Sequence, residues 1–262
     1  MRRQEPVSAD WLVPDWPAPP AVGAVCTTRT GGVSVGAFAG LNLGDHVGDD
    51  PAAVAKNRDR LAAAIGVRPV FLRQVHGIDV LRIDAQTPDG ATADAAVSTA
   101  SGVACTVMVA DCLPLLLCDT RARRVAAVHV GWRGLAQGVI ESVFRAWPSP
   151  GLRAQPAAAA ETLAWLGPCI GPRAFQIGPE VRAALLAADP GAAGCFSADE
   201  GNRWRADLPA LVRRRLAALG VQAVHGNDGG QPWCTVGNPA RWFSHRRDGV
   251  SGRMAACVWL RG

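Results

Sequence analysis

Apolar residues along this chain gather in short runs that glycine and proline separate. Runs of four to eight apolar residues bounded by such residues are typical of buried β-strands. We expect strands over 69–75, 78–83, 103–110, 114–118 and 124–130, one directly before GPCIGP (167–172), and a last one in RMAACVWL (253–260).

Helical signals alternate with these strands. Asp49 or Asp50 can cap a helix that has Pro51 in its first turn and ends at Gly66. Further helices are expected over 135–147, where apolar residues recur every three or four positions, from Pro179 onward, and over 207–220. Helices interspersed with many strands, some of them consecutive, favour an α/β (α+β) fold with mixed sheets.

We expect one domain over residues 1–262. The segment PSPGLRAQPAAAA (148–160) is the one candidate linker, but strand and helix alternate similarly on both sides of it. It is therefore interpreted as a surface excursion within that domain.

The composition argues against large anionic partners. The net charge is +5, yet Lys56 is the only lysine, and the arginines are scattered except for 213–215 on the solvent face of a helix. No basic stripe with interleaved aromatics appears, so we expect no nucleic-acid binding. No apolar run approaches the ~20 residues of a membrane span, and no signal peptide is visible, which predicts a cytoplasmic protein with no membrane contact. A small anionic ligand is compatible with the charge.

Eight cysteines are present, none in a CxxC pair, and most lie within apolar runs. This pattern predicts reduced, buried thiols rather than a disulfide framework or a zinc finger.

One cysteine differs from the rest, in VMVADCLPLLLCD (107–119). Cys112 stands at the end of an apolar run, as does His76 in FLRQVHG and His129 in VAAVHVGWRG. If these strand ends meet at one sheet edge, two imidazoles and a thiolate can hold Zn²⁺ and leave a fourth position open, although copper is possible. From the residues alone, Cys112 can equally be a buried thiol or a nucleophile with His129 as base. Cys118 is interpreted as a packing residue.

The neighbouring Asp111 helps to decide between these roles of Cys112. A carboxylate beside the thiol is expected to raise the thiol pKa, which disfavours a free nucleophile and favours a metal-bound thiolate. Asp111 itself can orient a ligand, act as a general base, or cap the turn before Pro114.

Several arginines can bind an anion. Arg58 lies on the apolar face of its helix, so it must either form a salt bridge or reach an anion. Arg246 and Arg247, between a strand-like stretch and a glycine turn, can clamp a phosphate, although such pairs are more often solvated.

Together these segments resemble the YfiH-like family, also called the laccase-domain or multicopper polyphenol oxidase family. The matching stretches, in the family's order from about Thr27 to Leu260, are TTRTGGVSVGAFAGLNLGDHVGDD, RQVHG, ADCLPLLLCD, HVGWRG, LGPCIGPRAFQIG and WFSHRRDGVSGRMAACVWL. The resemblance implies a four-layer α/β/β/α sandwich and a zinc held by His76, Cys112 and His129.

The resemblance also implies a function. Family members resemble purine nucleoside phosphorylases acting on adenosine, inosine, guanosine and methylthioadenosine, and also deaminate adenosine; some are described as copper-dependent phenol oxidases or as editing factors for muramyl-peptide precursors. His245 stands where the family often has Tyr, and Gln176 where it often has Glu. This chain has no tyrosine, so any role of that phenol is lost unless His245 replaces it.

The expected site follows. Asp111, Cys112 and His129 are the expected catalytic residues, with Asn42, His46 and Gln74 as hydrogen-bonding partners of the substrate. Arg58, Arg246 or Arg247 would hold the phosphate that attacks the ribose, and zinc would activate water against C6 of adenine. Five histidines without paired HxH arrangements disfavour a copper oxidase. The protein is expected to be a monomer or homodimer.

Overall fold

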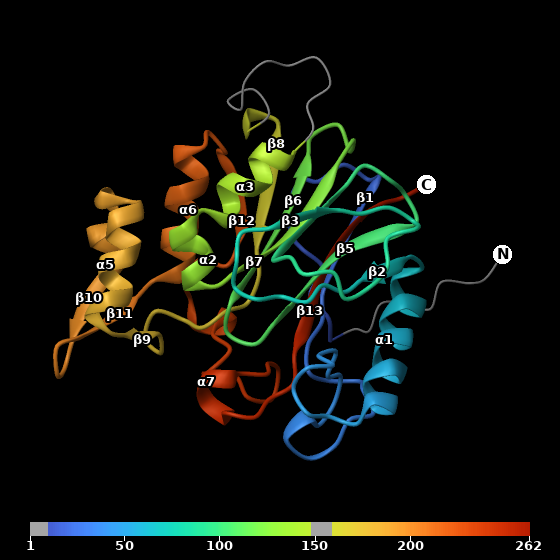
Figure 1. The fold of residues 1–262 in the computed structure, drawn as a ribbon, viewed down its shortest axis with the longest axis horizontal. Helices are drawn as coiled ribbons and strands as arrows, with labels where there is room; N and C mark the ends of the chain where they lie inside the picture. The colour runs from blue at the N-terminus through green and yellow to red at the C-terminus, as the bar shows by residue number, and fades with distance from the viewer. Residues whose placement is uncertain (1–9, 148–158) are drawn as a thin grey trace.

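The computed structural model describes residues 10–147 and 159–262, arranged around two central sheets (Figure 1). The expected surface excursion at 148–160 lies, apart from its last two residues, outside the described residues. The four-stranded sheet has the order β1 (Val22–Cys26), β13 (Met254–Leu260), β5 (Val103–Val109), β2 (Arg68–Val70). The six-stranded sheet has the order β12 (Ala223–Gly226), β8 (Thr162–Leu166), β6 (Leu113–Asp119), β7 (Val125–Val130), β4 (Ala95–Ser98), β3 (Val80–Arg82).

Both sheets mix strand directions. In the four-stranded sheet β2 is parallel to β5, whereas the other pairs are antiparallel. In the six-stranded sheet the outer pairs, β12 with β8 and β3 with β4, are parallel around an antiparallel centre. The mixed sheets expected from the sequence are confirmed.

Helices cover both outer faces. Helix α1 (Pro51–Ile65) packs on the four-stranded sheet through Leu61 and Ile65. Helices α2 (Trp132–Gln137), α3 (Val139–Ala146), α5 (Pro179–Ala188) and α6 (Leu208–Ala218) share one core with the six-stranded sheet. Figure 1 shows α1 on one side of the sheets and α2, α3 and α6 on the other, which confirms the four-layer sandwich.

The alternation of side chains explains why the central strands are apolar throughout. In β6, Leu115 and Leu117 face the helix layer, whereas Leu116 and Cys118 face the other sheet. Successive side chains of a strand point to opposite faces of the sheet. A strand that is buried on both faces therefore has apolar residues at every position. All seven residues of β6 are buried.

Several boundaries differ from the prediction. The strand expected over 69–75 ends at Val70, and the chain continues as a loop that carries Gln74 and His76. The helix expected over 135–147 is two helices, because Gly138 adopts a left-handed φ of 92° between them. The segment 243–249 contains a short helix, α7 (His245–Asp248), which Ser244 caps.

Sequence reasoning also missed short strands. β4 was not expected, nor was a three-stranded sheet with the order β10 (Phe196–Asp199), β11 (Arg203–Ala206), β9 (Gln176–Ile177). Short 3-10 turns cover Gly36–Phe38, Pro190–Cys195 and Gln231–Trp233. Among the described residues, no helix is long and apolar enough to cross a membrane.

The position of the site follows from one crossover. The chain leaves the four-stranded sheet at Val109 and enters the six-stranded sheet at Leu113. Asp111 and Cys112 therefore lie in the turn that joins the two sheets, at the edge of the space between them.

Candidate metal centre and its pocket

Three potential metal ligands meet at this edge. One ligand atom from each of His76, Cys112 and His129 lies within 4.8 Å of the other two. The Cys112 thiol lies 3.6 Å from His76 Nε2, and the two imidazole rings meet edge to face at 4.8 Å between centroids. Among the residues that the structure describes, this is the only group of three such side chains.

Strand register brings Cys112 and His129 together. The antiparallel ladder between β6 and β7 pairs Leu113 with Val130 and Pro114 with His129. Cys112, one residue before the start of β6, therefore lies opposite Gly131 and next to His129. Cys112 and His129 are seventeen residues apart in the sequence, and the antiparallel pairing of β6 and β7 brings them together.

His76 arrives from a loop rather than from a strand end. Its backbone has a φ of 61°, one of four positive values among the described residues other than glycine, and Asp111 has another at 91°. Side chains disfavour this conformation, and residues held in it cluster at functional sites. Two such residues beside one thiol indicate a site whose geometry the surrounding structure imposes.

A buried carboxylate organises both histidines. Asp94, just before β4, is fully buried, and its Oδ1 lies 2.8 Å from His129 Nδ1. The same carboxylate accepts hydrogen bonds from the backbone N–H groups of Val75, His76 and Gly77. A neutral imidazole that donates through Nδ1 presents the lone pair of Nε2 to the cluster, as metal-ligating histidines commonly do.

Gly131 leaves the space that the cluster occupies. A Cβ at this position would lie 2.7 Å from His76 Cδ2 and 3.1 Å from the Cys112 sulfur. Any side chain here would displace two of the three ligands. The glycine is therefore required by the close approach of the ligands rather than by backbone conformation.

The electrostatics favour a thiolate. Burial alone would raise the pKa of Cys112, but the positive charge of His129 and hydrogen bonds from both imidazoles outweigh burial and lower this pKa to about 6. Burial would lower the pKa of His129, but the thiolate and Asp94 raise it to about 9. The rise in the Cys112 pKa expected from Asp111 is therefore wrong, because the two imidazoles dominate the electrostatics of this thiol.

These donors fit a metal ion. Two imidazole nitrogens and a thiolate, with the thiol already easily deprotonated, match the ligand set of a zinc site that keeps one position open. The orienting carboxylate of Asp94 and the gap at Gly131 complete the surroundings such a site needs.

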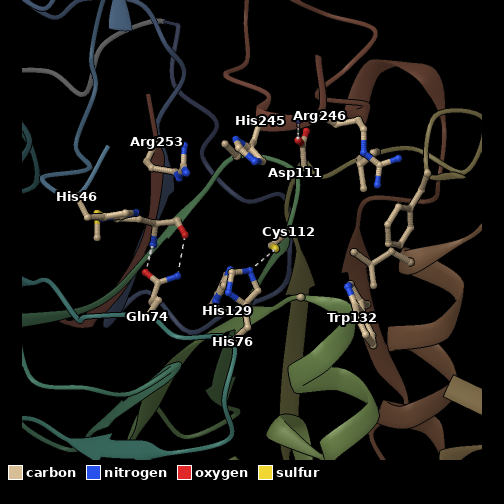
Figure 2. Close-up of a pocket in the computed structure, with 16 residues that line it drawn as sticks. His46, Gln74, His76, Asp111, Cys112, His129, Trp132, His245, Arg246 and Arg253 are labelled. Carbon is tan, nitrogen blue, oxygen red and sulfur yellow. Dashed lines mark hydrogen bonds between the residues drawn. The ribbon is translucent and has the colours of Figure 1, made fainter. Parts of the chain in front are cut away.

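Asp111 connects the site to α7. Its Oδ1 accepts the Thr235 hydroxyl at 2.5 Å, and its Oδ2 accepts the backbone N–H of Arg246 at 2.6 Å. Asp111 thus caps the first turn of a helix more than a hundred residues away, not the turn before Pro114. Figure 2 shows its carboxylate at the pocket wall above Cys112.

A cavity of about 320 Å³ opens above the three potential ligands. Apolar side chains form one part of its wall, and polar groups form the rest. The apolar residues are Met108, Ala110, Trp132, Ile170, Phe175 and Leu208; the other residues, beyond the three ligands and Gly131, are His46, Gln74, Asp111, His245, Arg246 and Arg253. Figure 2 shows Trp132 on one side and Arg253 on the other.

Three of the six expected substrate-binding residues line this cavity. Arg246 packs over the Phe175 ring at 5.7 Å and donates to the Gln176 carbonyl. His46 is half exposed, and burial together with the nearby Arg253 lowers its pKa, which keeps the ring neutral near pH 7. The amide of Gln74 exchanges two hydrogen bonds with the backbone of Met108, so it is already occupied.

The other three do not line the cavity. Asn42 is fully buried, and its amide bonds Gly44, Asp49 and the backbone of Arg253. Arg58 forms a salt bridge with Asp45 at 3.2 Å and lies over the Phe71 ring at 4.0 Å, which is the structural alternative considered for it. Arg247 pairs with Asp248 and binds the carbonyls of Thr235, Val236 and Trp242.

The two positions that depart from the family pattern differ in location. His245, the first residue of α7, lines the cavity. Gln176 is not a lining residue; its side chain donates to Asp199 at 2.8 Å, and only its carbonyl contacts Arg246.

Sequence reasoning missed the residues that support the site. Asp94, Gly131 and Arg253 received no role, although Arg253 stands directly before β13 at the cavity wall. A lone aspartate before an unrecognised strand carries no local signal. The available signal for Arg253 was its place before a fully apolar run, where a charged side chain must turn toward a sheet edge.

Comparison with known proteins defines the class. Residues 23–261 match the family described as "Multi-copper polyphenol oxidoreductase laccase". The chain therefore belongs to this family, which is the YfiH-like family expected from the sequence.

Among its relatives, a Pseudomonas aeruginosa protein named as a purine nucleoside phosphorylase is 51% identical over 96% of this chain and 98% of its own. The Escherichia coli purine nucleoside phosphorylase YfiH is 45% identical over 95% of this chain and 98% of its own. The crystal structure of Neisseria meningitidis protein NMB0706 superposes with a TM-score of 0.89 at 43% identity, covering 97% of this chain and all of that one. YlmD from Geobacillus stearothermophilus superposes with a TM-score of 0.88 at 30% identity over 99% and 98% of the two chains.

Proposed function

We propose that this protein is a zinc-dependent purine nucleoside phosphorylase that acts on adenosine, inosine, guanosine and methylthioadenosine, and that it also deaminates adenosine. The carrying observation is a cavity with the His76, Cys112 and His129 cluster at its floor and aromatic and cationic groups in its walls. The names of the relatives from Pseudomonas aeruginosa and Escherichia coli support the phosphorylase assignment.

His76, Cys112 and His129 would hold the zinc. When bound, zinc supplies a Lewis-acid charge at the floor of the cavity, where it can polarise a substrate oxygen or lower the pKa of water. The remaining chemistry belongs to the side chains of the walls.

The walls combine aromatic and cationic groups, since Arg246 packs over Phe175 and Arg253 lies across the cavity from Trp132. The flat rings of Trp132 and Phe175 suit a purine base, which stacks well on aromatic surfaces. Among the described residues, Arg246 and Arg253 are the arginines that line the cavity. Arg246 therefore stays a candidate for phosphate binding, and Arg253 takes the place of Arg58 and Arg247.

In phosphorolysis a phosphate oxygen bonds to the anomeric carbon of the ribose as the bond to the purine nitrogen breaks. The electron pair leaves with the purine, which takes up a proton. Asp111 and His245 lie in the upper wall beside Arg246 and are proposed to carry protons there. The bonds from Thr235 and Arg246 hold the Asp111 carboxylate in one orientation.

The test is separation of the products formed from inosine and from adenosine, with and without phosphate. Phosphate-dependent release of hypoxanthine together with ribose 1-phosphate is expected from inosine, and inosine is expected from adenosine. Base release that is equally fast without phosphate would show a hydrolase instead. Elemental analysis of the same sample is expected to find one zinc per chain rather than copper.

A second candidate is a cysteine hydrolase that uses Cys112 and His129. The lowered pKa of Cys112 favours it, because a thiolate is the reactive nucleophile. This alternative predicts activity that survives a chelator in metal-free protein, whereas the zinc enzyme must lose activity and regain it with zinc. A polyphenol oxidase finds less support, because one group of three ligands in the described residues is few for several coppers. Cytoplasmic location and a monomeric or homodimeric state stay predictions.

A further inference from the structure

Asp94 is a fully buried carboxylate that touches both histidines of the cluster without belonging to it. A buried charge is costly unless hydrogen bonds satisfy it. Four N–H groups point at this one, three from the backbone and one from His129. These four donors stabilise the carboxylate in its charged form, and two of them belong to the histidines of the cluster.

Its first contact determines which nitrogen of His129 can bind a metal. Nδ1 lies 2.8 Å from Asp94 Oδ1 and must carry a proton to donate there. His129 is nearly fully buried, and the contact with Asp94 holds its ring in this orientation. The carboxylate therefore leaves only Nε2 for the cluster.

Its second contact determines the path of the chain at His76. The N–H groups of Val75, His76 and Gly77 lie 3.1, 2.9 and 2.7 Å from the Asp94 oxygens. Three successive N–H groups around an anion form a nest, a backbone arrangement that requires left-handed conformations. His76 has such a conformation, with a φ of 61°, and the nest offsets its strain.

We propose that Asp94 is the positioning residue of the metal centre, which sets the tautomer of His129 and the backbone of His76 through one carboxylate. The inference rests on the metal centre of the proposed function. It explains how a ligand carried by a loop and a ligand carried by a strand share one geometry: β4 places Asp94 beside β7, since Ala95 pairs with Val128.

The test compares Asp94→Asn with Asp119→Asn. Asp119 is also fully buried and accepts bonds from Arg123, but it lies at the other end of β6. The Asp94→Asn substitution keeps the size of the side chain. It replaces one carboxylate oxygen with an amide N–H₂, which cannot accept a hydrogen bond from His129 or from the backbone N–H groups. Zinc affinity, measured by competition with a chromophoric chelator, is expected to fall by about 10–100-fold in Asp94→Asn and to stay unchanged in Asp119→Asn.

The absorption spectrum of the cobalt-substituted protein adds a readout of ligand geometry, and is expected to change only in Asp94→Asn. If the role of Asp94 is purely structural, Asp94→Asn will lower the melting temperature, as Asp119→Asn does, but will keep the zinc affinity of the wild type. That result would overturn the proposal. Failure of the wild type itself to bind zinc would instead refute the metal centre.

A measurement on the wild-type protein covers the case in which Asp94→Asn does not fold. Long-range ¹H–¹⁵N spectra of the zinc-loaded protein are expected to show His129 protonated at Nδ1 and zinc-bound at Nε2. Binding through Nδ1 would overturn the proposal, because the carboxylate would then have no proton to accept.

Discussion

The two ends of β6 carry nearly the same chemistry in mirror order. Asp111 and Cys112 precede the strand, and Cys118 and Asp119 end it. Both pairs place a carboxylate beside a thiol, yet the pKa of Cys112 is lowered to about 6, whereas the pKa of Cys118 is raised to about 12.

The difference lies in what each pair faces. Burial and then the charge of Asp119 raise the pKa of Cys118, which packs between the sheets. Asp119 is itself bound by arginine at 2.7 Å and so is a structural ion pair. At the other end two histidines face the thiol, and a cavity opens beside it. Residue types alone do not distinguish the two ends, whereas their neighbours do.

The largest contrast is expected between Cys112→Ala and Cys118→Ala. Loss of a direct ligand should reduce zinc affinity and phosphorolysis by more than the roughly 10–100-fold typical of an outer partner. Cys118→Ala should retain both and lose only packing. Metal analysis and the inosine assay on each variant check this; full phosphorolysis in Cys112→Ala would show that the site assignment is wrong.

Next in size is a contrast in reactivity. In metal-free protein at pH 7, iodoacetamide should modify Cys112 far faster than Cys118, because only the former is a thiolate. Since the pKa of Cys112 is lowered to about 6, its modification rate should be maximal above that pH and fall as the pH drops through it. Mass spectrometry of labelled peptides measures both rates. A midpoint near the ordinary thiol pKa would contradict the electrostatic account, and added zinc should protect Cys112.

Gly131→Ala tests how closely the ligands pack at the site end. The added methyl meets His76 and Cys112, so zinc affinity should fall on the order of tenfold, and overpacking should cost ~1–3 kcal/mol of stability. Gly194→Ala is the matched control, because nothing lies within 4 Å of its Cβ. Chelator competition and thermal unfolding compare the two; equal zinc affinities would mean that the ligands move aside without loss.

The smallest expected effect compares two arginines. Arg253→Ala should raise the KM for phosphate by about tenfold, the loss of one hydrogen bond to a charged group. Arg123→Ala, at the Asp119 end, should leave this KM unchanged but lower the stability, since it removes one partner of the buried Asp119 carboxylate. Initial rates at varied phosphate concentration separate the outcomes. An unchanged KM in Arg253→Ala would leave Arg246 as the phosphate ligand.

Sequence reasoning recovered the parts of the fold that local patterns determine. The long apolar strands and the capped helix α1 have strong periodicity and end signals, and they were predicted nearly to the residue. Short strands such as β4 and β9 were missed, because two to four residues carry too little pattern. The break at Gly138 was missed because an apolar stripe runs across it.

The site divides in the same way. The sequence predicted that His76, Cys112 and His129 come together, because each follows an apolar run and is a residue type that suits a metal; that they bind a metal stays a prediction. Arg58 and Arg247 were expected at the substrate but lie in ion pairs away from the cavity wall. A guanidinium on an apolar helix face, as for Arg58, shows only that it needs a partner, and the loop position of Arg247 did not specify which partner it has. Arg253 and Asp94 gained their places through contacts with residues far along the chain.

The amino-acid sequence by itself determined the buried strands, the helix caps and the residue types able to hold a metal, because these depend on neighbours a few positions away. The tertiary structure alone decided that Cys112 faces two histidines and Cys118 faces a core. The register between β6 and β7, and the carboxylate of Asp94 directly before β4, set those distances. Charge and burial act through space, so the same pair of residues is reactive at one end of a strand and inert at the other.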